Sequence, residues 1–157
     1  MKLQVITIGG LKQRYAQEGC ELFERRLRNL SRYELLELRD AKRGKTPQKS
    51  RWCREEGDRI RQALKQAPLW VALDERGESW TSRQLARFIQ EAQNRAHQTL
   101  PFVIGGPDGL DPELRAEAPK KLCLGTMTLP HELARLVLLE QLYRAHAIIA
   151  NLPYHRD

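Results

Sequence analysis

The sequence has few cysteines and no long hydrophobic run, and each absence excludes a class of protein. The three cysteines are scattered without a C-x-x-C pair, which argues against a disulfide scaffold and a zinc or redox motif, so we expect reduced thiols. Unbroken apolar runs such as 68–73 and 136–139 are far shorter than the ~20 residues of a membrane helix. The first residues lack the apolar core and cleavage site of a signal peptide, and we therefore expect a cytoplasmic protein.

What remains is the composition of a globular domain with a basic surface. The 157 residues are 41% hydrophobic and 30% charged, without a repeat or linker, so we predict one domain over residues 1–157. The formal charge is +7, and residues 39–54 hold seven Lys or Arg against one Asp. Such a patch suits a polyanion such as nucleic acid, although a solvated face that only aids solubility has the same composition.

Hydrophobic periodicity predicts five strands that alternate with helices. The strands are expected at 2–8, 33–38, 69–73, 101–104 and 121–124. The helices are expected at 11–30, from Pro47 to about residue 65, after a capping box at 81–84, from 111–112, and at 131–147. This alternation is typical of an α/β domain with a mostly parallel sheet and helices on both faces.

Two local details belong to this prediction. The polar segment 74–77 indicates a turn after the third strand. The apolar side of the last helix is expected to consist of Leu133, Leu136, Val137 and Ala147.

In open parallel sheets, ligands bind beyond the carboxyl ends of the strands, where three loops are expected to meet. The first follows Leu73. The second, Gly105–Gly109, is neither G-x-G-x-x-G nor a P-loop, and is either a tight turn or a loop that a ligand approaches closely. The third, Leu124–Leu129, is apolar with a few hydroxyls and suits either an adenine ring or a buried crossover.

Polar side chains also gather on the last helix and in the tail. His131 begins a near miss to H-E-x-x-H, because Arg135 replaces the second histidine, so a zinc site is not expected. His131 with Arg135, and Glu140 with Arg144, share helix faces, which ordinary salt bridging also explains. The tail 154–157 combines an aromatic ring, an imidazole and a guanidinium, which suit a nucleobase and its phosphate or simply a polar end.

Several of these segments together resemble the ribosomal large subunit methyltransferase H family, small members of the SPOUT or trefoil-knot methyltransferases, over residues 1–157. The segments that carry the resemblance are K-R-G-K at 42–45, L-D at 73–74, I-G-G-P-D-G at 104–109, T-L-P-H at 128–131, E-Q-L-Y-R-A at 140–145 and P-Y-H-R at 153–156. Their order and spacing make the set specific.

The resemblance implies a fold and an activity. The fold would be an α/β knot, with the C-terminal segment threaded through a loop, an exception to the rule against knots. The cofactor would be S-adenosylmethionine, and no metal or membrane would be needed. The protein would act as a homodimer, with its site near the subunit boundary. It would methylate N3 of a pseudouridine in 23S (large-subunit) rRNA on the assembled ribosome.

The resemblance, combined with residue chemistry, also implies three sets of site residues. The cofactor would be lined by Leu73, Gly105, Leu124, Gly125, Thr126, Met127, Thr128 and Leu129. The catalytic residues would be His155 to accept the N3 proton, Arg156 to stabilise the anion, and Tyr154 to stack on the base. RNA would be bound by Lys42, Arg43, Lys45, His131, Arg135 and Arg144.

Three other functions share part of this pattern. A non-catalytic RNA- or ribosome-binding protein would have the same basic patch and need no cofactor pocket. A Rossmann-type nucleotide enzyme is disfavoured, because the G-x-G-x-x-G turn and the acidic residue that follows it are missing. A zinc hydrolase is disfavoured by Arg135.

Overall fold

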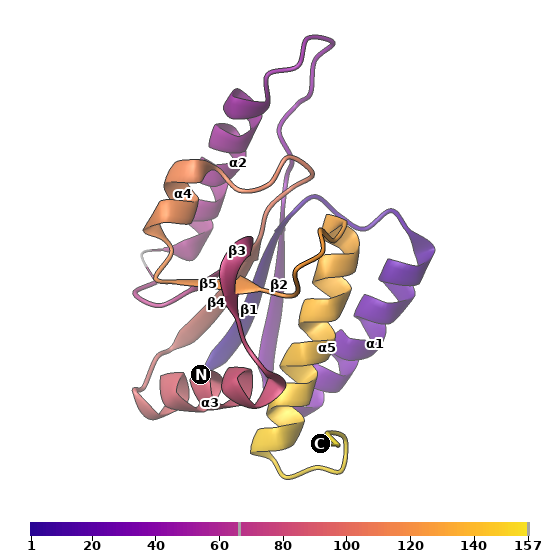
Figure 1. The fold of residues 1–157 in the computed structure, drawn as a ribbon, viewed down its shortest axis with the longest axis vertical. Coiled ribbons are helices and arrows are strands. Elements are labelled where there is room, and N and C mark those ends of the chain that lie inside the picture. Colours follow the sequence, from indigo (N-terminus) through magenta and orange to yellow (C-terminus); the bar gives the residue numbers. More distant parts are fainter. Residues whose placement is uncertain (66, 157) are drawn as a thin grey trace.

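The chain forms a five-stranded sheet flanked by helices, shown in Figure 1 as a computed structural model. The structure describes residues 1–65 and 67–156, so Gln66 and Asp157, the last residue of the tail, lie outside it. The elements are β1 (Lys2–Ile8), α1 (Arg14–Leu30), β2 (Arg32–Leu38), α2 (Lys49–Leu64), β3 (Val71–Ser79), α3 (Ser82–Asn94), β4 (Thr99–Ile104), α4 (Pro112–Glu117), β5 (Lys120–Cys123) and α5 (His131–Ile149).

The sheet has the strand order β2-β1-β4-β3-β5, and its strands pair in parallel. This arrangement confirms the predicted α/β class. No helix within the two described ranges combines the length and hydropathy needed to cross a bilayer.

Helices cover both faces of the sheet, and β1 shows why. Leu3 and Val5 enter one hydrophobic cluster, while Ile6 and Ile8 enter the other. Successive side chains of a strand point to opposite faces, so a strand that is apolar on both sides needs a helix layer on each. The helices α1, α3 and α5 form one layer, and α2 and α4 form the other (Figure 1).

The structure confirms two predicted helix starts. Thr81 accepts a hydrogen bond from the Gln84 amide, and the Gln84 side chain accepts one from the Thr81 amide, which completes the capping box of α3. The Asp111 carboxylate accepts a hydrogen bond from the Leu114 amide at the start of α4. These starts depend on contacts within a few residues, which a sequence reveals.

The predicted start of α2 at Pro47 is wrong. The helix begins at Lys49, after Gln48 in a non-helical conformation. The start of the preceding loop is bonded to the middle of α2, because the Ala41 amide donates to Glu56 at 3.0 Å. Thr46 and Pro47 therefore belong to the reversal of the chain that leads into the helix.

The predicted apolar side of α5 is also largely wrong. Leu133, Leu136 and Val137 are only half-buried, and Ala147 is the one residue of the four that is fully buried. The buried side instead consists mainly of Arg135, Leu138, Leu139, Leu142, Ala145 and His146. Because α5 carries apolar residues around most of its circumference, periodicity does not single out the face that meets the sheet.

The predicted turn at 74–77 lies within β3 and not after it. Leu73 and Glu78 both pair with Leu122, so the chain passes the same point of β5 twice. A Cβ on Gly77 would lie 2.7 Å from the carbonyl carbon and oxygen of Lys121, so here one backbone crosses directly over another. Figure 1 shows β3 in front of β5. The expected C-terminal knot stays a prediction.

Candidate active site and nucleic-acid interface

A cavity of about 690 Å³ opens beside residues 73–75 of β3 and beyond the ends of β4 and β5. Its walls are the chain after Leu73, the turn 105–110 and the loop 124–130, and the first residues of α5 close one side. The position is the strand-end edge at which α/β sheets bind ligands. The volume falls within the ~300–1,000 Å³ typical of small-molecule sites.

The cavity brings together most of the residues predicted to bind a cofactor. Its walls include Leu73, Gly105, Leu124, Gly125, Met127, Thr128 and Leu129. Thr126 is exposed and does not contribute to the wall. His131, predicted to bind RNA, also lines this cavity.

The glycine turn is both a tight turn and a wall of the cavity. The Gly109 amide donates to the Gly106 carbonyl at 2.9 Å, and Gly109 has φ +85°, a conformation that favours glycine. A Cβ on Gly105 would lie 2.7 Å from the Gly109 carbonyl carbon and 2.8 Å from the Leu110 nitrogen. The turn therefore closes on itself, and it presents backbone to the cavity.

The cavity combines an apolar wall with charges of both signs. Ile104, Leu122 and Leu124 supply apolar surface. Asp74, which is buried apart from a small part of its side chain, lies 3.6 Å from the Arg115 guanidinium. A ligand with an aromatic ring and charged groups of both signs fits such a lining.

A second cavity, of about 500 Å³, lies between the basic loop (residues 39–48) and α2. The cationic residues of its wall are Arg39, Lys42, Lys45, Arg51 and Arg59. Trp52 and Glu55 also contribute to the wall. The loop extends beyond the sheet at the top of Figure 1, so this cationic surface is accessible to a large polyanion.

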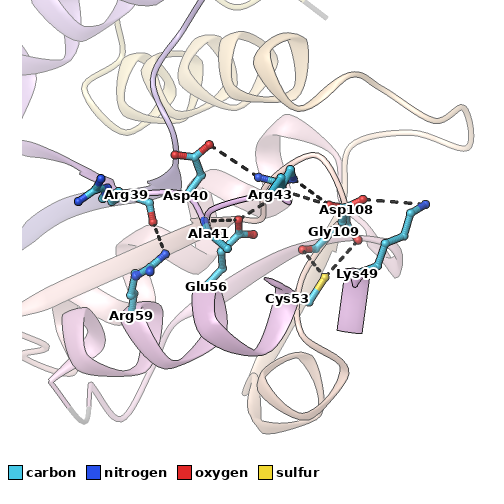
Figure 2. A network of polar contacts seen from close by, with 10 residues as sticks. All are labelled: Arg39, Asp40, Ala41, Arg43, Lys49, Cys53, Glu56, Arg59, Asp108 and Gly109. Carbon is cyan, nitrogen blue, oxygen red and sulfur yellow. Dashed lines mark hydrogen bonds and ion pairs between the residues drawn. The ribbon is translucent and has the colours of Figure 1, made fainter. Parts of the chain in front are cut away.

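Arg43 turns away from that surface, unlike Lys42 and Lys45. Its guanidinium lies 3.0 Å from Asp108, 3.4 Å from Glu56 and 3.7 Å from Asp40 (Figure 2). Three carboxylates thus surround it, and they raise the pKa of Arg43 against the opposing effect of burial. The geometry argues against the phosphate contact predicted for Arg43.

Two other arginines predicted to bind RNA are also paired with carboxylates of this chain. The Arg135 side chain is 5% exposed and pairs with Glu37 at 2.9 Å and Glu24 at 3.6 Å, so a phosphate does not reach it. Arg144 is paired with Glu140. The carboxylates that pair with them differ in burial: the Glu24 and Glu140 side chains are 12% and 20% exposed, whereas that of Glu37 is 41% exposed.

The tail folds back on α5. The Tyr154 hydroxyl donates to Glu140 at 3.0 Å, and the Arg144 guanidinium lies 4.7 Å from the Tyr154 ring centre. His155 Nδ1 is 3.5 Å from Arg144 Nη1, and Arg156 is exposed. Burial and the hydrogen bond to Glu140 raise the pKa of Tyr154, so its hydroxyl remains a donor.

This docking site is separated from the first cavity. Glu140 follows His131 by nine residues, which is about 14 Å along a helix at 1.5 Å per residue. His155 lines a third cavity, which shares Leu122 and Leu124 with the first. The structure therefore does not bring Tyr154 of the same chain to the first cavity.

Sequence reasoning missed Glu56 and the role of Asp108. Trp52, Glu56 and Ile60 follow one another at a helical spacing of four residues, and all three are buried. An acidic residue on an apolar stripe was the available signal, since a buried carboxylate requires a partner. Asp108 lay in a motif that had been singled out for its glycines.

The described residues offer no metal centre: within 1–65 and 67–156 no three His, Cys, Asp or Glu side chains are placed to share an ion.

A family model described as "Predicted SPOUT methyltransferase" matches residues 1–155.

Two curated relatives, both named ribosomal RNA large subunit methyltransferase H, match nearly the whole chain. The protein from Synechococcus sp. (strain CC9311) is 43% identical over 155 residues, covering 99% of this chain and 96% of the relative. The protein from Stenotrophomonas maltophilia (strain K279a) is 40% identical over 156 residues, covering 99% of each.

Two solved structures share the fold. A probable methylase family protein from Haemophilus influenzae Rd KW20 has a TM-score of 0.56 at 13% identity, covering 99% of this chain and 70% of that one. A probable methyltransferase from Bordetella pertussis Tohama I has a TM-score of 0.53 at 11% identity, covering 92% of this chain and 95% of that one.

Proposed function

This chain belongs to the SPOUT methyltransferase family, and from that premise we propose that it transfers a methyl group from S-adenosylmethionine to N3 of a pseudouridine in 23S rRNA. The observation that carries the proposal is the cavity beside residues 73–75 of β3 and the ends of β4 and β5, in a chain that matches relatives named rRNA methyltransferases over almost its full length. The basic cavity beside α2 supports an RNA substrate.

The lining of the first cavity suits the proposed cofactor. Leu122, Leu124 and Leu129 offer apolar surface for the adenine ring, and the backbone of the 105–109 turn offers groups for its polar edge. Asp74 and Arg115 supply charges opposite to those of the sulfonium, ammonium and carboxylate groups. The cofactor, when bound, supplies a methyl group that is already activated by its sulfonium.

The protein must then position and deprotonate the base. N3 of pseudouridine lies between two carbonyls and carries a proton, so it is a poor nucleophile until that proton leaves. We assign proton acceptance to His155, stabilisation of the resulting anion to Arg156, and stacking to Tyr154. We also assign to His131, which lines the wall of the cofactor cavity, a contact with the RNA near the target base.

A homodimer accounts for the separation between Tyr154 and the cofactor cavity. Tyr154 is docked about 14 Å along α5 from His131, so the tail of a second subunit is the group we assign to each site. Leu133, Leu136 and Val137 remain half-buried on α5, which supports a subunit interface along this helix.

The RNA surface consists of the cationic wall around Lys42 and Lys45. Its substrate is the assembled ribosome, and the cytoplasm is the compartment we propose. Each phosphate contact releases counterions, so replacing Lys42 by Gln should weaken ribosome binding and lower the slope of log Kd against log salt by about one.

The test is single-turnover methylation with labelled S-adenosylmethionine and ribosomes that lack the modification, followed by mass mapping of the rRNA. We expect one methyl group on one pseudouridine, and its loss in His155→Ala. Calorimetry with the cofactor is done in parallel. RNA binding without cofactor binding would instead favour a non-catalytic ribosome-binding protein. Unchanged transfer by His155→Ala would refute its role as the base.

A further inference from the structure

The basic loop and the glycine turn of the cofactor cavity are joined by one side chain. Arg43 Nη2 lies 3.0 Å from Asp108 Oδ2, and Arg43 Nε donates to the same oxygen at 3.3 Å. The Asp108 residue itself lines the cofactor cavity, whereas Arg43 does not. Figure 2 shows Arg43 between the loop, α2 and this turn.

Glu56 explains why Arg43 faces α2 and the glycine turn. This carboxylate is 2% exposed, and its Oε1 accepts hydrogen bonds from the Ala41 amide and from Arg43. Among the residues that the structure describes, its Oε2 has no hydrogen-bond partner, and a Cβ on Gly106 would lie 2.9 Å from it. Glu56 therefore lies directly behind the glycine turn, and a buried carboxylate in this position needs the charge of Arg43.

Two further contacts to the turn come from α2. Lys49 Nζ lies 3.9 Å from Asp108 Oδ1, and the Cys53 thiol donates to the Asp108 carbonyl at 3.6 Å. Arg43 also lies over the Trp52 ring, 5.4 Å from its centre, which limits the directions available to the guanidinium. Trp52 and Glu56 of α2 thus hold the Arg43 guanidinium in place where it contacts Asp108.

We propose that Arg43 is a positioning residue of the cofactor site, which fixes the 105–109 turn through Asp108. The inference rests on the proposed function, because it takes the cavity lined by this turn to bind S-adenosylmethionine. It separates Arg43 from Lys42 and Lys45, its neighbours in the basic loop, which face the RNA. Losing Arg43 should therefore weaken cofactor binding, although Arg43 does not touch the cofactor.

The experiment measures binding of S-adenosylhomocysteine by calorimetry in the purified full-length protein. We expect Arg43→Gln to raise the Kd at least fivefold, a size common for coupling between sites. Arg54→Gln removes the same charge from an exposed position of α2 and should leave the Kd within twofold. Because Arg43 acts through Asp108, adding Arg43→Gln to Asp108→Asn should cause no further loss.

Two additional measurements separate positioning from a loss of fold. Arg43→Gln leaves Glu56 charged and buried, so the double variant Arg43→Gln/Glu56→Gln is measured as well. It should unfold near the wild-type urea midpoint and still bind the cofactor weakly. In steady state, KM for S-adenosylmethionine should rise while KM for ribosomes stays within twofold.

The outcomes distinguish the two proposals. Wild-type protein that does not bind S-adenosylhomocysteine refutes the proposed function itself. Wild-type binding with an unchanged Kd in Arg43→Gln, or additive losses in the Arg43 and Asp108 double variant, overturns the positioning role alone. A rise in KM for ribosomes without a rise in KM for the cofactor also overturns the positioning role, and would indicate that Arg43 contacts RNA.

Discussion

Replacing Gly105 by alanine tests whether the glycine turn shapes the cofactor cavity. The new methyl group would lie 2.7 Å from the Gly109 carbonyl carbon, 2.8 Å from the Leu110 nitrogen and 3.0 Å from the Gly109 oxygen. All three are backbone atoms, so no side-chain rotation relieves the contact. Overpacking of this kind costs about 1–3 kcal/mol, and we expect the free energy of unfolding in urea to fall by that amount.

The same substitution should reduce cofactor affinity. The turn opens to admit the methyl group, and about 1.4 kcal/mol corresponds to a tenfold change in Kd, so we expect a loss of tenfold or more in calorimetry with S-adenosylhomocysteine. Gly44→Ala is the matched control, because a Cβ there meets no atom within 4 Å. It should leave unfolding within about 0.5 kcal/mol and the Kd unchanged. Equal stability and affinity in Gly105→Ala and the wild type would refute the reasoning.

Three further predictions concern groups outside the cavity. Burial lowers the pKa of His146 below 6.5, whereas in the unfolded chain this imidazole has its ordinary pKa near 6.5. The free energy of unfolding should therefore fall as the pH drops below about 6.5. Urea titrations of His146→Gln should lack this part of the pH dependence. Burial raises the pKa of Cys20 to about 11, so an aromatic disulfide reagent at pH 8 should not modify it until the protein is unfolded; rapid labelling of Cys20 in the native state would contradict this. Tyr154→Phe removes the hydrogen bond to Glu140, worth about 1.5–3 kcal/mol for a charged acceptor, so carboxypeptidase should remove the tail at least tenfold faster. An unchanged digestion rate would show that this bond does not hold the tail.

The parts of the fold that were predictable depend on nearby residues. β1 was predicted with its observed limits, because its alternating pattern and its Val and Ile residues indicate a strand. The α3 start was predicted because Thr81 and Gln84 cap each other. The extent of β3 was not predictable, because its polar residues 74–77 read as a turn. They cross β5 instead, and β5 lies more than 40 residues further along the chain.

In the candidate site, too, some features were predictable from the sequence and others were not. The three loops of the cofactor cavity were located by a rule about parallel strands, which needs only the order of the elements. The orientation of Arg43 was not predictable, because it depends on Glu56 and Asp108, which are 13 and 65 residues away. Arg135 was likewise assigned to RNA on its spacing alone, whereas Glu24 and Glu37 determine its direction.

The passage of Gly77 over Lys121 has a consequence for co-translational folding of the protein. Residues 71–79 leave the exit tunnel well before residues 120–123, so this contact waits until residues 120–123 have emerged. Until then the nascent sheet ends at an uncovered β3 edge, which is a hazard for aggregation. The sheet is therefore complete only once β5 has joined it, however early its first strands associate.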